Sequence, residues 1–299
     1  MIESPILYMG SKKKLINQGL INLFPNSINT FYDLFGGSGI VSMNTKADNY
    51  VLNDIDSKLF EFYALFKKYE SADIIYKILE NIKKFDMKRV GTKQNTYGAE
   101  KAKDNYCKLR DYANSTKSIV DLYTCTFYAF SQQMRFNSKG EFNMPFGNGA
   151  FSKTNEYYIA YGCKFFSGNN VSITNKSFKD INVDKLESND FVYLDPPYFN
   201  STATYNENGG WTKDNEEELY NFCETLDKKG IKWAMSNAFT TRGNANGSLV
   251  EWSKKNDYSV YHFNDFDYTP MGKSASNVDE VLISNYKPQY DEQISLFDF

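Results

Sequence analysis

The chain has 299 residues, 41% hydrophobic and 17% aromatic, with a formal net charge of −3, which allows one large α/β domain or a core with an insert. No apolar run approaches the ~18 residues of a membrane span, and residues 1–14 lack the layout of a signal peptide, so we expect a cytoplasmic protein. The cysteines lack Cys-x-x-Cys spacing and His262 is the single histidine, so no zinc site, disulfide framework or histidine-based catalysis is indicated.

The first predicted strand runs into a glycine turn. A helical pattern at residues 14–23 precedes an apolar run at 31–35, which ends in Gly36-Gly37-Ser38-Gly39 and is followed by a second helical pattern. Such a turn lets the backbone approach a ligand at a helix N-terminus. The next strand, near 50–53, ends at Asp54, and an acidic residue about 20 positions after the glycines is typical of ribose binding in α/β folds.

Residues 56–130 are predicted to be mainly helical, which is too long a stretch for a loop and indicates a helical subdomain. The charge is also concentrated here: residues 58–140 carry 16 Lys and Arg against 9 Asp and Glu, whereas residues 180–299 carry 10 against 21. A basic segment suits contact with nucleic acid phosphates, and a solvated helical surface is the alternative. Residues 131–146 are more polar, with Asn137-Ser138-Lys139-Gly140 as a turn, and predict a β-hairpin.

The segment Asp195-Pro196-Pro197-Tyr198 follows directly on an apolar strand at 191–194. Each proline fixes its own φ and keeps the preceding residue extended, so Asp195 is expected to be rigid. It lies at the carboxyl end of a strand, where open α/β sheets bind ligands. A fixed carboxylate, a backbone carbonyl and an aromatic ring suit a flat base that carries an amino group. The alternative is an edge-strand turn.

The remaining pattern completes an α/β chain. A helix at 153–166 and a strand at 171–173 precede the Asp-Pro-Pro-Tyr strand, and residues 214–217 have the composition of a helix start. Further strands are expected near 231–235, 258–263 and 278–285, with a tail from Pro288.

Taken together, these motifs resemble the Dam-type DNA adenine methyltransferases, which use S-adenosylmethionine. The resemblance covers nearly the whole chain, and the middle stretch from Arg135 to Gly147 is its most specific part. The order of the motifs is similar to the group that places target recognition between the cofactor and catalytic motifs. The matching segments are Tyr8-Met9-Gly10-Ser11-Lys12, Asp33 to Gly39, Asn53-Asp54, Arg135 to Gly147, Asp195 to Tyr198, Ser236-Asn237 and Val278 to Leu282.

The resemblance implies a doubly wound, Rossmann-like methyltransferase sheet with a helical target-recognition insert that carries a β-hairpin. It implies a catalytic domain that binds S-adenosylmethionine at residues 1–57 and 148–287, and a DNA-recognition insert at 58–147 with its hairpin near 131–146. Residues 288–299 would form a C-terminal tail.

A cofactor site is also implied. Asp54 would take the ribose hydroxyls, and Phe178 would either lie against the cofactor adenine or pack in the core. Lys12 would face the cofactor carboxylate or target DNA. The expected cofactor residues are Tyr8, Gly10, Lys12, Asp33, Phe35, Gly37, Asp54, Phe178 and Asp195.

The expected catalytic residues are Asp195, Pro196, Pro197 and Tyr198. An adenine amino group is a poor nucleophile because its lone pair is delocalised into the ring. The Asp195 carboxylate and the Pro196 carbonyl can each accept one amino hydrogen, and fixed acceptors stabilise developing charge without reorganising. Tyr198 would stack on the extruded base. No metal or covalent intermediate is required.

DNA reading is expected on the hairpin. Arg135 is the candidate for a bidentate guanine contact in the major groove, and Gln132 and Met134 either fill the gap left by the flipped base or form loop surface. Leu7 and Asn148 stand where GATC-methylating members tend to carry basic residues, which argues against a GATC target. The expected DNA-binding residues are Ser131, Gln132, Met134, Arg135, Asn137, Asn143 and Pro145.

Double-stranded DNA is the expected partner, which places the protein near the host nucleoid. The segment Gln293-Ile294-Ser295-Leu296-Phe297 is similar to the peptide by which bacterial replication proteins dock on the sliding clamp. It would place Leu296 and Phe297 in an apolar pocket, and packing of the tail on its own domain is the alternative. The sequence leaves open whether a cognate restriction endonuclease exists.

Alternatives to adenine methylation remain. Amino methylation of cytosine or of RNA would use the same acceptors, although the family usually has Ser at the position of Asp195 for cytosine. Cytosine-5 methylation is disfavoured because that reaction uses a Pro-Cys nucleophile, and no cysteine here follows a proline. A non-catalytic DNA-binding relative would require a damaged Asp-Pro-Pro-Tyr segment or glycine turn, and both are intact.

Overall fold

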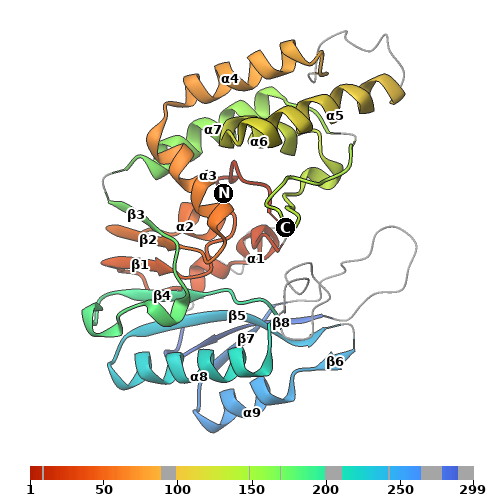
Figure 1. Cartoon of the computed structure of the whole chain (residues 1–299). Helices are drawn as coiled ribbons and strands as arrows, with labels where there is room; N and C mark the ends of the chain where they lie inside the picture. The colour runs from red at the N-terminus through yellow and green to blue at the C-terminus, as the bar shows by residue number, and fades with distance from the viewer. Residues whose placement is uncertain are drawn as a thin grey trace, which may run out of the picture. The chain divides into compact units, whose positions relative to one another are not determined.

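Figure 1 shows the computed structural model of the chain, which packs as two compact units. Unit 1 comprises Met1–Ser11, Gly37–Met43 and Asp56–Ile173, and unit 2 comprises Lys12–Gly36, Asn44–Ile55 and Thr174–Phe299. Each unit is therefore built from segments that lie far apart in the sequence. The structure describes residues 1–8, 10–88, 99–147, 149–168, 170–198, 211–241, 243–263 and 278–288.

Unit 2 is built on a sheet with parallel central strands. Strands β1 (Thr30–Asp33), β2 (Asn49–Asn53), β4 (Phe191–Leu194) and β5 (Lys232–Thr241) lie in the order β2-β1-β4-β5, and each neighbouring pair is parallel. Strand β8 (Asp279–Ser284) continues the sheet antiparallel to β5, and β7 (Ser259–His262) pairs antiparallel with β8. The short β6 (Asn244–Ala245) pairs with the end of β5. The predicted α/β class with a mostly parallel central sheet is confirmed.

One face of this sheet is covered by helices. In Figure 1, α8 (Lys213–Lys228) and α9 (Gly247–Lys255) lie side by side along it, and both pack on β5. All four residues of β4 are buried, as expected for a central parallel strand covered on both faces. The core on the helix side includes Val192, Leu194, Leu219, Leu226, Trp233, Leu249, Trp252 and Ile283.

An aromatic cluster lies on the alternate residues of the central strands. The ring centroids of Phe24 and Phe31 lie 5.9 Å apart, and each lies 5.0–6.3 Å from the centroids of Phe191 and Tyr193. Phe191 and Tyr193 alternate with the strand residues of the helix-side core. The chain reaches Phe24 through α1 (Lys13–Asn17) and a 3-10 turn, Leu20–Leu23. The continuous helix expected at residues 14–23 was wrong, because Gly19 adopts a left-handed conformation with φ 93° and breaks it.

Unit 1 is mainly helical. Its helices are α3 (Ser57–Lys68), α4 (Ser71–Lys84), α5 (Ala99–Thr116), α6 (Ile119–Thr126) and α7 (Lys153–Phe166). Helices α3 and α4 both pack on α6 and α7, and α5 packs on α6. Tyr123 of α6 contacts Phe62 and Phe66 of α3, with ring centroids 5.5 Å apart in each pair. Packing thus groups α7 with the helices that precede the hairpin. The division of the chain at residue 147 into a DNA-recognition insert and a catalytic domain stays a prediction.

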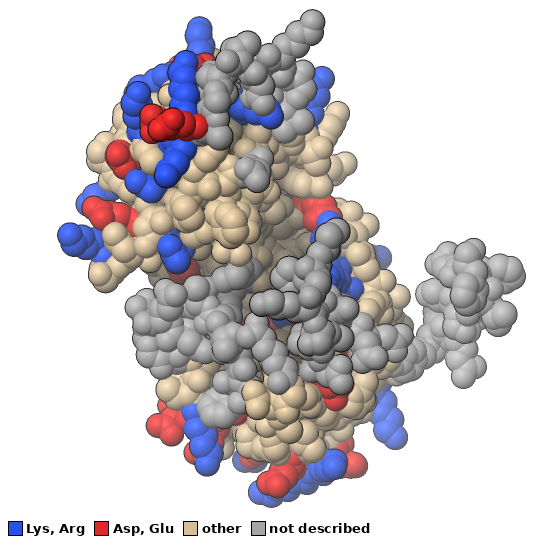
Figure 2. Space-filling model, turned by 90° about the vertical axis from the view of Figure 1, so that its right-hand side faces the viewer, with Lys and Arg blue, Asp and Glu red and all other residues tan. Residues whose placement is uncertain are grey.

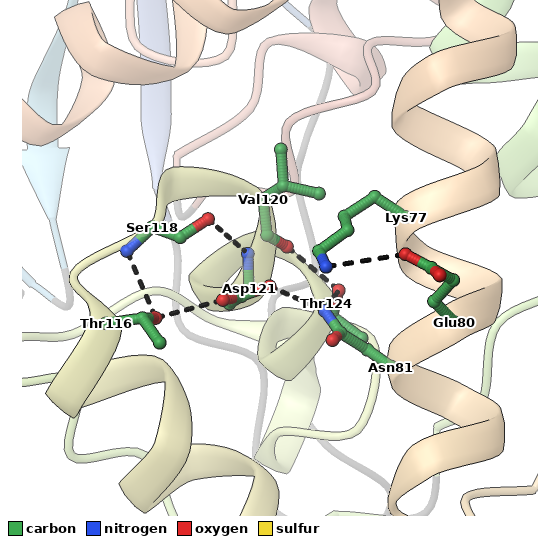
Figure 3. Close-up of polar contacts among 8 residues, drawn as sticks. All are labelled: Lys77, Glu80, Asn81, Thr116, Ser118, Val120, Asp121 and Thr124. Atoms are coloured by element: carbon green, nitrogen blue, oxygen red, sulfur yellow. Dashed lines mark hydrogen bonds and ion pairs between the residues drawn. The ribbon is translucent and has the colours of Figure 1, made fainter.

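A buried polar network links α4 to α6 inside unit 1 (Figure 3). The Asn81 amide donates to Asp121 Oδ1 at 2.8 Å and to Thr124 Oγ1 at 3.2 Å, and the Thr116 hydroxyl donates to Asp121 Oδ2 at 2.9 Å. Asn81 and Asp121 are only 1% and 2% exposed. Buried polar groups are costly without partners, so this network fixes how α4 meets α6.

The predicted hairpin at residues 131–146 is present in an irregular form. Two antiparallel bridges, Ala129↔Phe146 and Phe136↔Phe142, join its arms. Asn137 closes the turn, since its side chain accepts hydrogen bonds from the backbone N–H groups of Lys139 and Glu141. Regular strands are interrupted because Ser131 and Gln132 have positive φ angles and Pro145 has no N–H to donate.

Several other local details differ from the sequence-based expectation. Helix α8 begins at Lys213 with Thr212 as its N-cap, in a reciprocal capping box with Asn215, so the start expected at Asp214 was misplaced. Helix α9 and strand β6 were not anticipated. Within the described part of the chain, no helix combines the length and the apolar character that a membrane crossing needs.

Candidate active site

Acidic residues stand at the carboxyl ends of three neighbouring parallel strands in unit 2. Asp33 is the last residue of β1, Asp54 follows β2, and Asp195 follows β4. The chain leaves β1 towards β2 on one side and leaves β4 towards β5 on the other. The gap between the ends of β1 and β4 is therefore a topological switch point, where open α/β sheets bind ligands.

Lys12 contacts both ends of the Asp-Pro-Pro-Tyr segment. Its Nζ lies 2.8 Å from Asp195 Oδ1, in an ion pair whose side chains are 10% and 17% exposed. The same ammonium lies 5.0 Å from the centroid of the Tyr198 ring, a distance at which cations are attracted to aromatic faces. Lys12, predicted as a contact for cofactor or DNA, is thus placed on the predicted catalytic residues.

Glu280 of β8 is a further member of this cluster. The Tyr198 hydroxyl donates a hydrogen bond to Glu280 Oε2 at 3.1 Å, and Glu280 is 4% exposed. Glu280 lies in a segment that matches the family resemblance, but no role for this residue was predicted from the sequence. The signal that was available is an acidic residue in an apolar strand, at a position that alternates with Val281 and Ile283 of the core.

Burial and charge oppose each other at this cluster. Burial raises the pKa of the Asp195 carboxyl from 3.8 to about 6, against the effect of the Lys12 ammonium, and the charge of Glu280 adds to the rise. Burial alone would lower the pKa of Lys12, but the charges of Asp195 and Glu280 outweigh it and raise the pKa. The ion pair is therefore present at neutral pH, and Asp195 takes up a proton as the pH falls towards 6.

Asn53 fixes the backbone at the end of β2. Its amide donates to the carbonyls of Leu34 at 3.0 Å and Lys176 at 2.9 Å, and its Oδ1 accepts from the Thr174 hydroxyl at 2.7 Å. The next residue, Asp54, is 9% exposed, and its N–H donates to the Thr174 carbonyl. Asn53 thus joins the ends of β1 and β2 to the segment after Thr174 and sets the position of Asp54.

An aromatic group surrounds Phe178, next to the end of β1. Its ring centroid lies 5.6 Å from Phe35 and 6.2 Å from Trp211, and Phe35 and Trp211 lie 6.0 Å apart. Phe178 is 6% exposed and belongs to the core on the helix side, whereas Phe35 and Trp211 are only partly buried. Trp211 was not predicted as part of the site, because no local motif marks it.

Three of the predicted cofactor residues, Tyr8, Gly10 and Gly37, belong to unit 1. Gly10 and Gly37 have φ angles of 80° and 52°, in the left-handed region that favours glycine. The turn around Gly37 is anchored within unit 1, where the Tyr63 hydroxyl donates to the Gly37 carbonyl at 2.6 Å. The helix that follows, α2 (Ile40–Asn44), is short.

The hairpin displays polar and apolar groups at the surface of unit 1. Ser131, Arg135 and Pro145 are exposed, and Met134 is half-buried. The Arg135 guanidinium donates through Nε to Asn143 Oδ1 at 3.0 Å, so two predicted DNA-binding residues contact each other across the arms. Gln132 instead donates to the Phe127 carbonyl at 3.3 Å. Asn148, named for its bearing on the target sequence, lies outside the described residues.

Phe130 is a surface residue that was not predicted from the sequence. It is 58% exposed and precedes two residues with positive φ, Ser131 and Gln132. The arm opposite it passes very close, because a Cβ atom at Gly147 would lie 2.5 Å from the Ala129 carbonyl oxygen. The glycine is therefore needed for this approach. Only the structure separates Phe130 from the buried aromatics that precede it.

Helix α5 supports the hairpin from one side. The Asn114 side chain donates to the Phe142 carbonyl at 3.1 Å and accepts from the Phe142 N–H at 2.8 Å, and the Tyr106 hydroxyl donates to the Met144 carbonyl at 2.8 Å.

Lys and Arg side chains are visible over the helical unit in Figure 2. Lys83, Lys84 and Lys88, at and beyond the end of α4, are among the exposed ones.

Similar proteins match most of the chain. It is 34% identical over 292 residues to the type II methyltransferase M.FokI of Planomicrobium okeanokoites, and 30% identical over 293 residues to the modification methylase StsI of Streptococcus sanguinis. These matches cover 95% and 96% of this chain but 43% of each relative, so the chain spans less than half their length. A DNA adenine methylase of Vibrio cholerae serotype O1 is 29% identical over 219 residues, covering 69% of this chain and 72% of that protein.

A family model, D12 class N6 adenine-specific DNA methyltransferase, matches residues 8–273. The matched range includes the glycine turn, the hairpin and the Asp-Pro-Pro-Tyr segment. This chain therefore belongs to the D12 class of N6 adenine-specific DNA methyltransferases.

Proposed function

We propose that the chain transfers a methyl group from S-adenosylmethionine to the exocyclic amino group of a flipped adenine at a specific site in double-stranded DNA. The observation that carries the proposal is the rigid Asp195-Pro196-Pro197-Tyr198 segment at the end of β4, with Lys12 paired to its carboxylate. Family membership supports the same reaction.

Asp195 and Pro196 are the proposed acceptors for the two amino hydrogens. Lys12 holds Asp195 Oδ1, which fixes the orientation of the carboxylate and directs Oδ2 to accept a hydrogen. The Pro196 carbonyl is fixed by the restricted backbone of the two prolines. Acceptors fixed in this way localise the nitrogen lone pair and stabilise charge as it develops in the transition state. Tyr198 offers a ring on which the base stacks.

The residues of unit 2 fit S-adenosylmethionine in chemical character. The Asp54 carboxylate, fixed through Asn53, suits the ribose hydroxyls, and the partly buried Phe35 ring suits the adenine. Phe178 supports Phe35 from the core side. When bound, the cofactor supplies an electrophilic methyl group on a sulfonium. Lys12, Asp195 and Glu280 together carry one negative charge when ionised, which suits a cation.

DNA recognition is proposed for the hairpin and the helices of unit 1. The exposed Arg135 is the proposed base reader, and the exposed Phe130 is a candidate to insert between bases, as apolar side chains do at kinked steps. Lys83, Lys84 and Lys88 are proposed phosphate contacts. The clamp-binding prediction for Gln293–Phe297 lies outside the described residues. It stays a prediction, as does a cognate restriction endonuclease.

Transfer of tritium from methyl-labelled S-adenosylmethionine tests the reaction. The substrates are plasmid DNA from a host without adenine methylation and, in parallel, a bulk RNA, and the labelled nucleoside is then identified by chromatography. We expect N6-methyladenine from DNA only. Label in cytosine or in RNA would replace the proposal with one of the alternative amino methylations, and absence of label from both would remove the enzymatic assignment.

A further inference from the structure

We propose that Glu280 is a positioning residue for methyl transfer, which orients the Tyr198 ring through a hydrogen bond from the tyrosine hydroxyl. The inference rests on the proposed function, because it takes Tyr198 as the surface on which the target base stacks. It adds a role for a residue of β8, a strand that contributes no other proposed catalytic residue.

Glu280 contacts the hydroxyl of Tyr198, and Lys12 lies over the face of its ring. The Tyr198 hydroxyl donates to Glu280 Oε2 at 3.1 Å, while the Lys12 ammonium lies 5.0 Å from the ring centroid. A ring held at its hydroxyl and attracted at its face has few orientations left. A base that stacks on this ring is thereby aligned with the acceptors at Asp195 and Pro196. Alignment of reacting groups contributes strongly to rate, and a misplacement of about 1 Å can cost about 100-fold.

The burial of Glu280 supports a role in positioning Tyr198. The side chain is 4% exposed, and burying a carboxylate is costly unless it is paired and hydrogen-bonded. A strand residue that only filled space would be apolar, like its neighbours Val281 and Ile283 in the core. Strand β8 pairs with β5, where Glu280 lies opposite Ala238, so the backbone position of the carboxylate is fixed by the sheet.

Asp279 provides a matched control. It is the adjacent acidic residue on the same strand, and its carboxylate contacts His262 Nδ1 at 2.8 Å with 38% of the side chain exposed. Successive strand residues point to opposite faces, so Asp279→Asn removes a charge from β8 without touching Tyr198. A general effect of losing an acid from β8 would appear in Asp279→Asn as well.

The first measurement detects the hydrogen bond between Tyr198 and Glu280 and does not depend on methyl-transfer activity. In protein labelled with 13C at the tyrosine ring, the Tyr198 resonance is assigned by its loss in Tyr198→Phe. We expect this resonance to shift in Glu280→Leu and to stay unchanged in Asp279→Asn. An unshifted Tyr198 resonance in a folded Glu280→Leu would overturn the proposal, whether or not the chain methylates DNA.

The second measurement is single-turnover methyl transfer with saturating DNA and cofactor. We expect Glu280→Leu and Tyr198→Phe each to lower the rate by about tenfold or more, and the double variant to lose no more than either one, because both remove the same interaction. Glu280→Gln keeps an acceptor oxygen and should retain most of the rate, as should Asp279→Asn. The effect should appear in kcat rather than in the KM for cofactor.

Thermal melting of each variant separates positioning from folding. If Glu280→Leu fails to fold, the comparison of Tyr198→Phe with Glu280→Gln still decides, since both keep the size of the original side chain. Wild-type rates in Tyr198→Phe, or additive losses in the double variant, would contradict the proposal. An inactive wild type with an intact shift of the Tyr198 resonance would count against the proposed function and leave the Glu280 contact standing.

Discussion

The end of β4 and the recognition hairpin differ in how they hold their functional side chains. At β4, the Lys12–Asp195 ion pair has side chains that are 10% and 17% exposed, and Glu280 is almost fully buried. On the hairpin, Phe130 is 58% exposed and Arg135 is also exposed. Chemistry on an amino group needs acceptors that do not move, whereas reading a duplex needs side chains that reach it. Changes at β4 should therefore alter how fast methyl transfer occurs, and changes on the hairpin should alter where it occurs.

The largest expected effect is at Asp195. Asp195→Ala removes an acceptor that acts mainly in the transition state, so methyl transfer should fall by about 100-fold or more while cofactor affinity changes by less than about tenfold. Single-turnover kinetics on saturated complexes measures the first quantity and calorimetry with a cofactor analogue the second. Retention of more than about a tenth of the wild-type rate would break the assignment of β4 to the chemistry.

Arg135 tests the other side of the comparison. Arg135→Ala should relax the sequence preference, with a loss of about 1–3 kcal/mol of discrimination at one base pair, and leave the rate on the preferred site less affected. Lys84→Ala is the control, because a phosphate contact should lower affinity evenly across sequences. Methylation profiling on a library of randomised sites reads both variants. An unchanged motif in Arg135→Ala would mean that another residue reads the DNA.

Asn81 tests whether the helices that carry the hairpin depend on their buried polar network. Asn81→Ala removes one of the hydrogen-bond donors to the buried Asp121 carboxylate. This loss should lower the free energy of unfolding by about 2 kcal/mol. The exposed Lys77–Glu80 pair on the same helix, in which Glu80 directly precedes Asn81, supplies the control (Figure 3), because Glu80→Ala should change stability by less than about 0.5 kcal/mol. Urea unfolding of both variants gives the comparison, and equal effects would show that the network does not stabilise the contact between α4 and α6.

Asp54 tests whether the residues at the end of β2 bind the cofactor and not DNA. Asp54→Ala should weaken cofactor binding by about tenfold or more, since a hydrogen-bonded charged group contributes about 1.5–3 kcal/mol, and should leave DNA affinity unchanged. Asp48→Ala, an exposed acid just before β2, should change neither. Calorimetry with the cofactor analogue and a DNA shift assay give the two affinities. Equal cofactor affinity in the two variants would take Asp54 out of the site.

The pH dependence is the smallest expected effect. Because the pKa of Asp195 is raised to about 6, the carboxylate needed as an acceptor is lost as the pH falls through 6, and the single-turnover rate should fall about tenfold between pH 7.5 and pH 5. Acid unfolding caused by protonation of Asp195 does not explain such a loss of rate. A carboxyl with a raised folded-state pKa contributes stability that is present at low pH and lost as the pH rises through about 6. A flat rate profile, with circular dichroism showing folded protein throughout, would contradict the pKa assignment.

Local patterns predicted the elements that depend on local physics. The strand before Asp195, the helix at Lys153–Phe166 and the turn at Asn137 are each encoded by adjacent residues, and they lie where expected. The break at Gly19 was missed, because apolar spacing continues past it. The start of α8 was expected at Asp214 rather than after Thr212, because both are residue types that cap helices.

The cluster around Tyr198 could not be predicted in the same way. Lys12, Asp195 and Glu280 come from three distant segments, and the sheet order that brings β8 beside β5 is set by the packing of the whole unit. The sequence marked Asp195 by its prolines and Lys12 by resemblance. Glu280 carried only the weak signal of an acid in an apolar strand. No local feature of the sequence predicts that Phe130 is exposed, because the aromatic residues just before it are buried.

The proposed reaction and the roles of Asp195 and Arg135 can be tested together by sequencing DNA from an expressing host, with detection of modified bases. We expect N6-methyladenine confined to one short sequence motif in cells that express the wild type, the loss of that modification with Asp195→Ala, and a broadened motif with Arg135→Ala. Modified cytosine in place of adenine, or adenine methylation that persists at full level with Asp195→Ala, would contradict these assignments.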